Sequence, residues 1–350
     1  MDMRDPAPGF EAPPPRLVEN GRQRLGRFHG PPVQANLIDA SYLGLPRALR
    51  RWRLKEWQAI QIATPDLFVN AALFDAKLIQ LLQVKIYDRA RGQKHLHERQ
   101  LRPGAFRVAD QLVDSSTAYR DRRGLLRFDN RFGAGRIEVE IDLQASRRCP
   151  RIAGRLAIHT DRGASQIVSL PLSGEVGMYS HKGMFPVEGE LVVGDDTHRL
   201  TARDALALLD DHKGYYPYVM RWDWVTSAIH DGRGRALGFN LTRNQCRDPE
   251  TFNENCAWID DRIGRLPAVT FERDRPGQAD ECWRIRDRDG RVDLRFDPTV
   301  PGDVRLNALV IESRYRGPFG RFSGRLEAEG LEAIDVEGWF GMGEEFWLRC

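Results

Sequence analysis

The first strongly apolar segment of the chain is Leu67-Phe-Val-Asn-Ala-Ala-Leu-Phe74, and after Asp75 and Ala76 a second one follows, Lys77-Leu-Ile-Gln-Leu-Leu-Gln-Val-Lys-Ile-Tyr87. The leucines of the second segment alone would suit a helix. Its β-branched residues and the alternation of Val84 and Ile86 favour a strand instead. We therefore predict two paired strands joined by a tight turn at Asp75 and Ala76.

The same pattern continues in both directions from this pair. From about Asn36 onward, short apolar runs alternate with Gly, Asp and Pro turns, and one short helix is predicted at 202–209, with Thr201 as its N-cap. The absence of a strand–helix–strand alternation predicts an all-β chain of barrels or sandwiches, with about eight strands in each half. Further strands are predicted at 125–130, 136–143, 152–160, 165–170, 187–193, 219–229, 236–243, 268–273, 283–286, 292–296, 305–314, 321–327 and 334–347.

Length and composition bound the architecture. A chain of 350 residues exceeds the size at which one core usually keeps growing, so we expect two β domains, at 33–195 and 196–350. Residues 1–32 hold seven prolines and predict a disordered or extended arm. No apolar run reaches the roughly 18 residues of a membrane helix, and the first residues lack a secretory signal, so a cytoplasmic protein without a membrane span is expected.

Charge and cysteine usage exclude several classes of function. The basic residues are 47 arginines and 6 lysines, but 50 acidic residues are interleaved with them and the net charge is +3, which argues against nucleic-acid binding. The five cysteines show no metal-finger spacing and are expected to be reduced and mostly buried. No cofactor motif and no metal site are predicted. The sequence does not indicate an oligomeric state.

The chemically richest residues are concentrated between Asp211 and Asn255. The segment contains Asp211-His-Lys-Gly-Tyr-Tyr-Pro217, Trp222-Asp-Trp224, Gly238-Phe-Asn-Leu-Thr242 and Asn253-Glu-Asn255. Aromatic surface beside a few acid–base and amide groups is the mixture that a small-molecule pocket needs. We predict a ligand site here.

A hairpin turn at Asp231-Gly-Arg-Gly234 predicts how part of this segment folds. If Asp231 faces Gly234, Trp224 lies opposite Leu241, and Val225 lies opposite Asn240. One face would then be aromatic and apolar, with Trp222, Trp224, Phe239 and Leu241, and the other polar, with Arg221, Asp223, Asn240 and Thr242. An ordinary amphipathic hairpin explains this pattern as well as a ligand-lined face does, and a slip of one residue would change the pairing.

Several acid–base groups are candidates for catalysis. His212 follows Asp211, and a histidine beside a carboxylate is a common acid–base arrangement, although adjacent residues of an extended chain point in different directions. Asp211 could instead accept backbone hydrogen bonds, and Glu254 could be a general acid or a turn residue. His181-Lys182 is a weaker candidate. The catalytic candidates are Asp211, His212, Asp223 and Glu254, and the ligand-binding candidates are Tyr215, Tyr216, Trp222, Trp224, Asn240, Asn253 and Asn255.

These motifs, in this order along the chain, resemble the family catalogued as domain of unknown function 2804. The resemblance runs from about Asn36 to the C-terminus. It also uses Lys55-Glu-Trp57, Tyr179-Ser-His-Lys-Gly183, Gly317-Pro-Phe-Gly-Arg-Phe-Ser-Gly324 and Gly341-Met-Gly-Glu344.

That family is in turn distantly similar to carotenoid hydratases and natural-product cyclases built from two lipocalin-like barrels. Those relatives carry a tryptophan-rich stretch with an Asp-His pair where the second half begins, and Asp211-His212 occupies that place. Lys213 stands where they carry an acidic residue, and the tryptophan before the pair is missing. The resemblance implies two lipocalin-like antiparallel β-barrels, with the short helix between or near them.

Three functions follow as alternatives. The first is binding of an apolar, lipid- or isoprenoid-like small molecule in a barrel or in a cavity between barrels. The second is an enzyme of hydratase or cyclase type acting on an isoprenoid double bond, in which a buried carboxylic acid protonates the alkene and aromatic rings stabilise the cation. The third is a carbohydrate-binding β protein, because aromatic rings beside amides also suit sugars. A closed apolar cavity would favour the first two, and a shallow site with exposed tryptophans the third.

Overall fold

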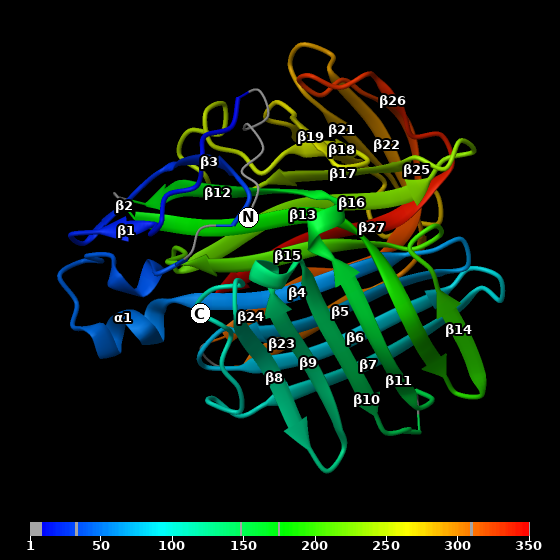
Figure 1. Ribbon diagram of the computed structural model, residues 1–350, viewed down its shortest axis with the longest axis horizontal. Helices are drawn as coiled ribbons and strands as arrows, with labels where there is room; N and C mark the ends of the chain where they lie inside the picture. The colour runs from blue at the N-terminus through cyan, green and yellow to red at the C-terminus, as the bar shows by residue number, and fades with distance from the viewer. Residues whose placement is uncertain (1–8, 32–33, 148, 174–175, 309–310, 350) are drawn as a thin grey trace.

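Two curved antiparallel sheets make up most of the molecule (Figure 1). The computed structural model describes residues 9–31, 34–147, 149–173, 176–308 and 311–349. Within this part of the chain one α-helix is present, α1 (Arg47–Arg53), at the outer edge of the molecule. The prediction of an all-β protein with two lipocalin-like barrels is confirmed.

The first sheet is formed by the N-terminal part of the chain. In the described residues it has 13 strands, and its main path runs β7-β6-β5-β4-β15-β13-β11-β10-β9-β8. Its strands are β3 (Gly26–His29), β4 (Lys55–Ala63), β5 (Leu67–Asp75), β6 (Gln80–Asp88), β7 (Gln93–Leu101), β8 (Ser115–Asp121), β9 (Gly124–Arg131), β10 (Arg136–Leu143), β11 (Ile152–His159), β12 (Ala164–Ser173), β13 (Val176–Val193), β14 (Asp196–Leu200) and β15 (Leu206–Gly214).

The second sheet follows, with 12 strands among the residues described and the main path β19-β18-β17-β16-β27-β25-β22-β21-β20. Its strands are β16 (Val219–His230), β17 (Ala236–Arg243), β18 (Cys256–Ile259), β19 (Arg262–Arg265), β20 (Thr270–Asp274), β21 (Cys282–Arg286), β22 (Val292–Val300), β23 (Asp303–Ala308), β24 (Ile311–Arg316), β25 (Phe319–Leu326), β26 (Ile334–Asp335) and β27 (Trp339–Arg349). The strand predicted for 305–314 lies partly outside the described residues, which contain β23 and β24 on either side.

Three groups of buried apolar side chains explain why the sheets hold together. The inner face of the first sheet packs around residues such as Val69, Val84 and Phe128. The inner face of the second packs around residues such as Phe239 and Trp283. A further cluster joins the sheets, with Phe68 and Met184 from the first against Trp224, Trp258 and Phe340 from the second. Central strands are consequently buried on both faces.

The change from one sheet to the other falls between Gly214 and Val219. Strands β14 and β15 pair with β13, so the first sheet extends past residue 195, where the sequence suggested a boundary. The predicted N-terminal arm is extended in its described part. There β1 (Val18–Glu19) pairs with β2 (Arg22–Gln23), β3 joins the first sheet, and Leu17 and Phe28 are fully buried.

The helix predicted at 202–209 is wrong. Residues 206–209 belong to strand β15, whose inner face meets the first core and whose outer face meets the second sheet. A strand buried on both sides carries apolar residues without alternation, and such a run cannot be distinguished from a buried helix by periodicity. The α-helix that does form, α1, contains Arg47–Arg53 and was not predicted.

The predicted register of the β16–β17 hairpin is also wrong, by one residue. Trp224 lies opposite Thr242 and Thr226 opposite Asn240, because His230 pairs with Ala236 and a loop of residues 231–235 closes the hairpin. The Asp231 carboxylate accepts hydrogen bonds from the backbone N–H groups of Arg233 and Arg235, which stabilises this longer loop. The two tryptophans therefore share a face with Asn240 and Thr242, while Phe239 and Leu241 point into the second core.

Two smaller expectations concern cysteines and membranes. Cys149, Cys256 and Cys282 are buried and unpaired, Cys246 is partly buried, and Cys350 lies outside the described residues. No helix in the described ranges has the length and apolar character needed to cross a bilayer.

Candidate functional site

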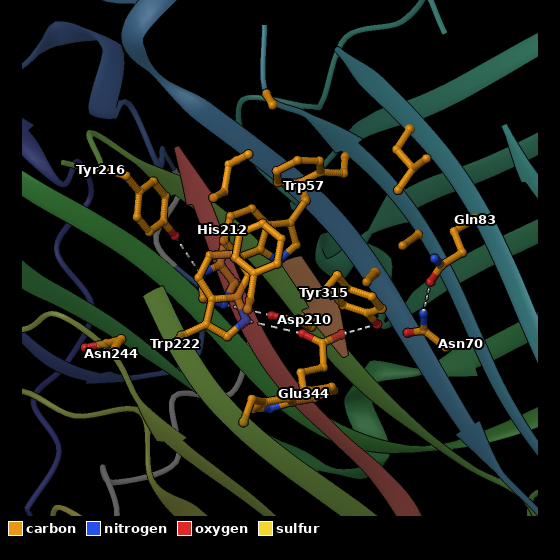
Figure 2. Close-up of a pocket in the computed structure, with 18 of the residues that line it drawn as sticks. Trp57, Asn70, Gln83, Asp210, His212, Tyr216, Trp222, Asn244, Tyr315 and Glu344 are labelled. Atoms are coloured by element: carbon orange, nitrogen blue, oxygen red, sulfur yellow. Dashed lines mark hydrogen bonds and ion pairs between the residues drawn. The ribbon is translucent and has the colours of Figure 1, made fainter. Parts of the chain in front are cut away.

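A cavity of about 200 Å³ lies between the outer faces of the two sheets. Strands β4 to β7, β13 and β15 line it from one side, and β16, β27, Tyr315 and the loop before β18 line it from the other. Figure 2 shows Tyr216 and Asn244 towards one end, Asn70 and Gln83 towards the other, and Trp57, His212 and Trp222 between them. The cavity thus has an aromatic middle and two polar ends.

The aromatic middle is built by stacking. The ring of Trp57 stacks on the His212 ring, with centroids 4.3 Å apart and an interplanar angle of 13°. Trp222 stacks on Trp57 at 5.4 Å and on Phe346 at 3.9 Å. Side chains locked against one another in this way lose little freedom on binding, so they form a preorganised apolar wall.

Strand register places a polar cluster beside the aromatic middle. Trp57, His212 and Ser180 are cross-strand partners on β4, β15 and β13, and Asp210 is likewise the partner of Lys182. Partners on adjacent strands share a face, and so do residues two apart on one strand. His212, Asp210, Ser180 and Lys182 therefore converge on one spot, which Glu254 approaches from the second sheet.

Hydrogen bonds in this group show that one ring nitrogen of His212 carries a proton. His212 Nε2 lies 2.8 Å from Asp210 Oδ1 and 3.1 Å from Ser180 Oγ, and the Ser180 hydroxyl donates to Glu254 Oε2 at 2.9 Å. Because the carboxylate only accepts and the serine proton is already donated, Nε2 carries the imidazole proton. Nδ1 is the other ring nitrogen, and the Tyr216 hydroxyl lies 3.5 Å from it (Figure 2).

Charge pairing compensates for burial in this polar cluster. Lys182 Nζ lies 2.6 Å from Asp210 Oδ1 and 3.5 Å from Glu254 Oε2. Burial acts to raise the pKa of Asp210, but the nearby Lys182 and His212 outweigh it and the pKa falls below its ordinary range. Burial acts to lower the pKa of Lys182, yet the two carboxylates raise it. The Lys182–Asp210 pair is therefore ionised at neutral pH.

A second carboxyl group lies beside the aromatic middle. Glu344 accepts a hydrogen bond from the Tyr315 hydroxyl at 2.7 Å and another from Trp222 Nε1 at 3.3 Å. Burial raises the pKa of Glu344, although the bond from Tyr315 and the charge of Lys85 oppose this shift. A carboxyl group with a raised pKa keeps its proton to a higher pH than an exposed glutamate does.

One of the two polar ends is a row of amides on the first sheet. Gln61 Nε2 donates to Asn70 Oδ1 at 2.8 Å, Asn70 Nδ2 to Gln83 Oε1 at 3.3 Å, and Gln83 Nε2 to Glu98 Oε2 at 2.7 Å. A carboxylate only accepts, so Glu98 sets the direction of the whole row. Each amide retains a second N–H, and Gln61 retains its carbonyl oxygen, for a ligand.

Five of the residues predicted from the sequence line the cavity: His212, Tyr216, Trp222, Trp224 and Glu254. Asn240 supports them, since it accepts a hydrogen bond from Trp224 Nε1 at 2.6 Å and donates to the Glu254 carbonyl at 3.0 Å. Asn253 and Asn255 shape the loop that carries Glu254, because Asn255 N–H donates to Asn253 Oδ1 and Asn255 Oδ1 accepts from Thr242 N–H.

The other predicted residues lie away from the cavity. Asp211 is on the opposite face of β15 from His212, fully buried. The Tyr179 hydroxyl is a neighbour of its carboxylate, and burial raises the pKa of Asp211 to about 6 despite the nearby Lys213 and His212. Asp223 pairs with Arg243 and Arg273 on the other face of β16. Tyr215 stacks on Tyr42 at 4.3 Å.

Several cavity residues were missed by the sequence analysis. Asp210 could have been found, because residues 210 and 212 share a face as soon as 206–214 is taken as a strand. Ser180 neighbours His212 through the pairing of β13 with β15. The same pairing sets Lys182, from the weaker candidate pair His181-Lys182, beside Asp210. Trp57 and Glu344 lie within motifs that the sequence analysis quoted, but nothing in their local sequence places them beside His212.

Comparison with known proteins shows the family to which the chain belongs. The chain belongs to the family described as Domain of unknown function (DUF2804), whose profile matches residues 17–349. No curated protein matches it. The expected family membership is confirmed.

Two solved structures are similar in fold. One is CghA with Sch210972, at 12% identity, covering 83% of this chain and 88% of that chain with a TM-score of 0.50. The other is kievitone hydratase from Nectria haematococca, at 11% identity, covering 84% and 88% with a TM-score of 0.50. At these identities the likeness concerns the fold alone, and it agrees with the two lipocalin-like barrels described above.

Proposed function

We propose that this protein binds an apolar small molecule in the cavity between its two sheets. The observation that carries the proposal is the stacked aromatic wall formed by Trp57, Trp222 and Phe346, which lines the cavity between the sheets. Apolar walls with a few placed polar groups are typical of small-molecule sites. The carbohydrate alternative is less well supported, because Trp57 and Trp224 are buried and not displayed on an open surface.

Solvent extraction of purified protein followed by mass spectrometry tests this proposal. Ala72 faces the cavity, so Ala72→Trp or the smaller Ala72→Phe fills part of the space. We expect an apolar molecule in about stoichiometric amount from wild type and a strongly reduced amount from both Ala72 variants. Ala118→Trp, on edge strand β8, is the matched control and should retain the molecule. Equal recovery from all variants would contradict binding in the cavity.

The amide row adds a requirement on the ligand. Its remaining N–H groups and the Gln61 carbonyl suit an uncharged group that both donates and accepts, such as a hydroxyl. We expect wild type to bind 2-naphthol about fivefold more tightly than naphthalene, because one neutral hydrogen bond contributes roughly 1 kcal/mol. Asn70→Leu breaks the row and should abolish this preference, as measured by equilibrium dialysis.

A buried glutamine on the opposite face of β6 serves as the control for this test. Gln80 is hydrogen-bonded to the backbone of Phe106 and does not line the cavity. Gln80→Leu should therefore retain the preference for 2-naphthol even if it lowers stability. An unchanged preference in Asn70→Leu would show that the row does not contact the ligand.

A second candidate function is acid–base catalysis on the bound molecule. It is favoured by one observation: Asp210 holds the Nε2 proton of His212, so Nδ1 is the ring nitrogen that would exchange a proton with a bound molecule beside the aromatic wall. Orientation by a carboxylate is how enzymes set the tautomer of a catalytic histidine. Glu344, with its raised pKa, offers a proton donor in the same cavity.

Deuterium exchange separates this enzyme from a pure binder. The molecule recovered from the cavity is incubated with protein in deuterium oxide, and mass spectrometry reports deuterium incorporated at carbon. We expect incorporation with wild type, loss with Asp210→Asn and His212→Gln, and retention with Asp211→Asn, whose side chain faces away. Absence of incorporation with wild type would leave binding as the function.

A further inference from the structure

Helix α1 exposes its large apolar side chains to solvent, whereas a surface helix usually buries them against the protein. None of its residues is buried. Two of its arginines face the body of the protein, where Arg50 donates to the Ala40 carbonyl and Arg53 to the Tyr216 carbonyl. Leu49 and Trp52, three residues apart and so on one side of the helix, remain 51% and 46% exposed.

Two more apolar side chains extend this surface. Leu43 is 76% and Tyr218 58% exposed, and with Leu49 and Trp52 they are the large exposed hydrophobic residues in the described part of the chain. The stacking of Tyr42 on Tyr215 and the bond from Arg53 to Tyr216 hold the two segments side by side. We call Leu43, Leu49, Trp52 and Tyr218 the apolar patch.

The segment around the patch is strongly cationic. Between Ser41 and Lys55 the chain has five cationic residues, Arg47, Arg50, Arg51, Arg53 and Lys55, and no acidic one. Elsewhere acidic and basic residues are interleaved, so that the whole chain carries only +3. Asp39 pairs with Arg47, whereas Arg51 makes no ion pair with a described residue.

We propose that the apolar patch docks on an anionic phospholipid surface. Tryptophan and tyrosine favour the membrane–water interface, leucine enters the acyl region, and neighbouring arginines bind lipid phosphates. Separate side chains that protrude from the surface suit a fluid bilayer, whereas protein partners receive their anchors in shaped pockets. The next strand, β4, begins at Lys55 and carries Trp57, so the docked face adjoins the wall of the cavity.

Vesicle co-sedimentation of the full chain tests this proposal. We expect the protein to bind vesicles of mixed phosphatidylcholine and phosphatidylglycerol much more strongly than phosphatidylcholine alone, and less as salt is added. The double variant Leu49→Ser, Trp52→Ser should bind about tenfold more weakly, because its apolar contacts are lost. Arg51→Gln should weaken binding about fivefold.

Arg288→Gln, an equal change of charge in the turn between β21 and β22, is the matched control and should bind as wild type does. Both patch positions are exposed, so melting temperatures close to wild type are expected. Absence of binding to the anionic vesicles by wild type, or equal binding by wild type and the double variant, would overturn the proposal. So would analytical ultracentrifugation that finds a wild-type dimer and a monomeric double variant, because the patch would then be covered by a second copy.

Discussion

Replacing Lys182 with methionine is expected to lower the free energy of unfolding by about 3–5 kcal/mol at neutral pH, as measured by urea denaturation. Lys182 is the cation that lies between the partly buried carboxylate of Asp210 and the buried carboxylate of Glu254. Without it, His212 is the remaining group at this spot that can compensate their charge. Removal of one partner from a buried pair is costly because the other charge stays desolvated.

Two further variants make this prediction specific. Lys94→Met changes an exposed lysine on β7 and should alter stability by less than about 0.5 kcal/mol. The double variant Lys182→Met, Asp210→Asn should lose less than the sum of its single variants, because the unpaired charge is removed together with its partner. Strict additivity, or equal losses in Lys182→Met and Lys94→Met, would contradict the ion pairing described for the cavity.

Asp211→Asn is expected to remove a pH-dependent loss of stability. The pKa of Asp211 is raised from 3.8 to about 6 in the folded protein, mainly by burial. The folded state therefore favours the protonated carboxyl. The protonated Asp211 carboxyl contributes fully to the free energy of unfolding below about pH 4. This contribution is lost as the pH rises through about 6, and it amounts to about 3 kcal/mol for a pKa shift of about two units.

Unfolding free energies of wild type and Asp211→Asn, measured over this pH range, test whether ionisation of Asp211 destabilises the folded protein. The advantage of the variant should grow as the pH rises from about 4 to above 6 and then level off. Asp110→Asn, which changes an exposed aspartate, should follow the wild-type profile. A variant whose stability runs parallel to wild type at every pH would mean that the Asp211 carboxyl is not desolvated.

Much of the fold could be predicted because the two faces of many strands lie in different environments, so that apolar and polar residues alternate along the sequence. The hairpin at 67–87 was predicted from the Val84 and Ile86 alternation, and β5 and β6 form it. Strand β15 shows no such alternation, because both of its faces are buried. The apolar run from Leu206 to Leu209 therefore predicted a helix. The β16–β17 register was missed because the Asp231 side chain stabilises a loop one residue longer than the glycines alone suggest.

The candidate site could be predicted only in part. Its aromatic residues Trp222 and Trp224 and its base His212 are visible in the sequence, but their partners depend on strand pairing over long distances. Asp211 is adjacent to His212 in sequence and points away from it, whereas Asp210 shares its face. Trp57 reaches His212 because β4 pairs with β15, and Glu344 reaches Trp222 because β27 pairs with β16.

A crystal structure of the protein soaked with 2-naphthol tests the central claim most directly. We predict that the naphthyl ring lies between the two sheets against Trp57 and Trp222, with its hydroxyl hydrogen-bonded to the row of Gln61, Asn70 and Gln83. Density for the probe inside the core of either sheet or on the outer surface, with the cavity between the sheets filled by water, would contradict it.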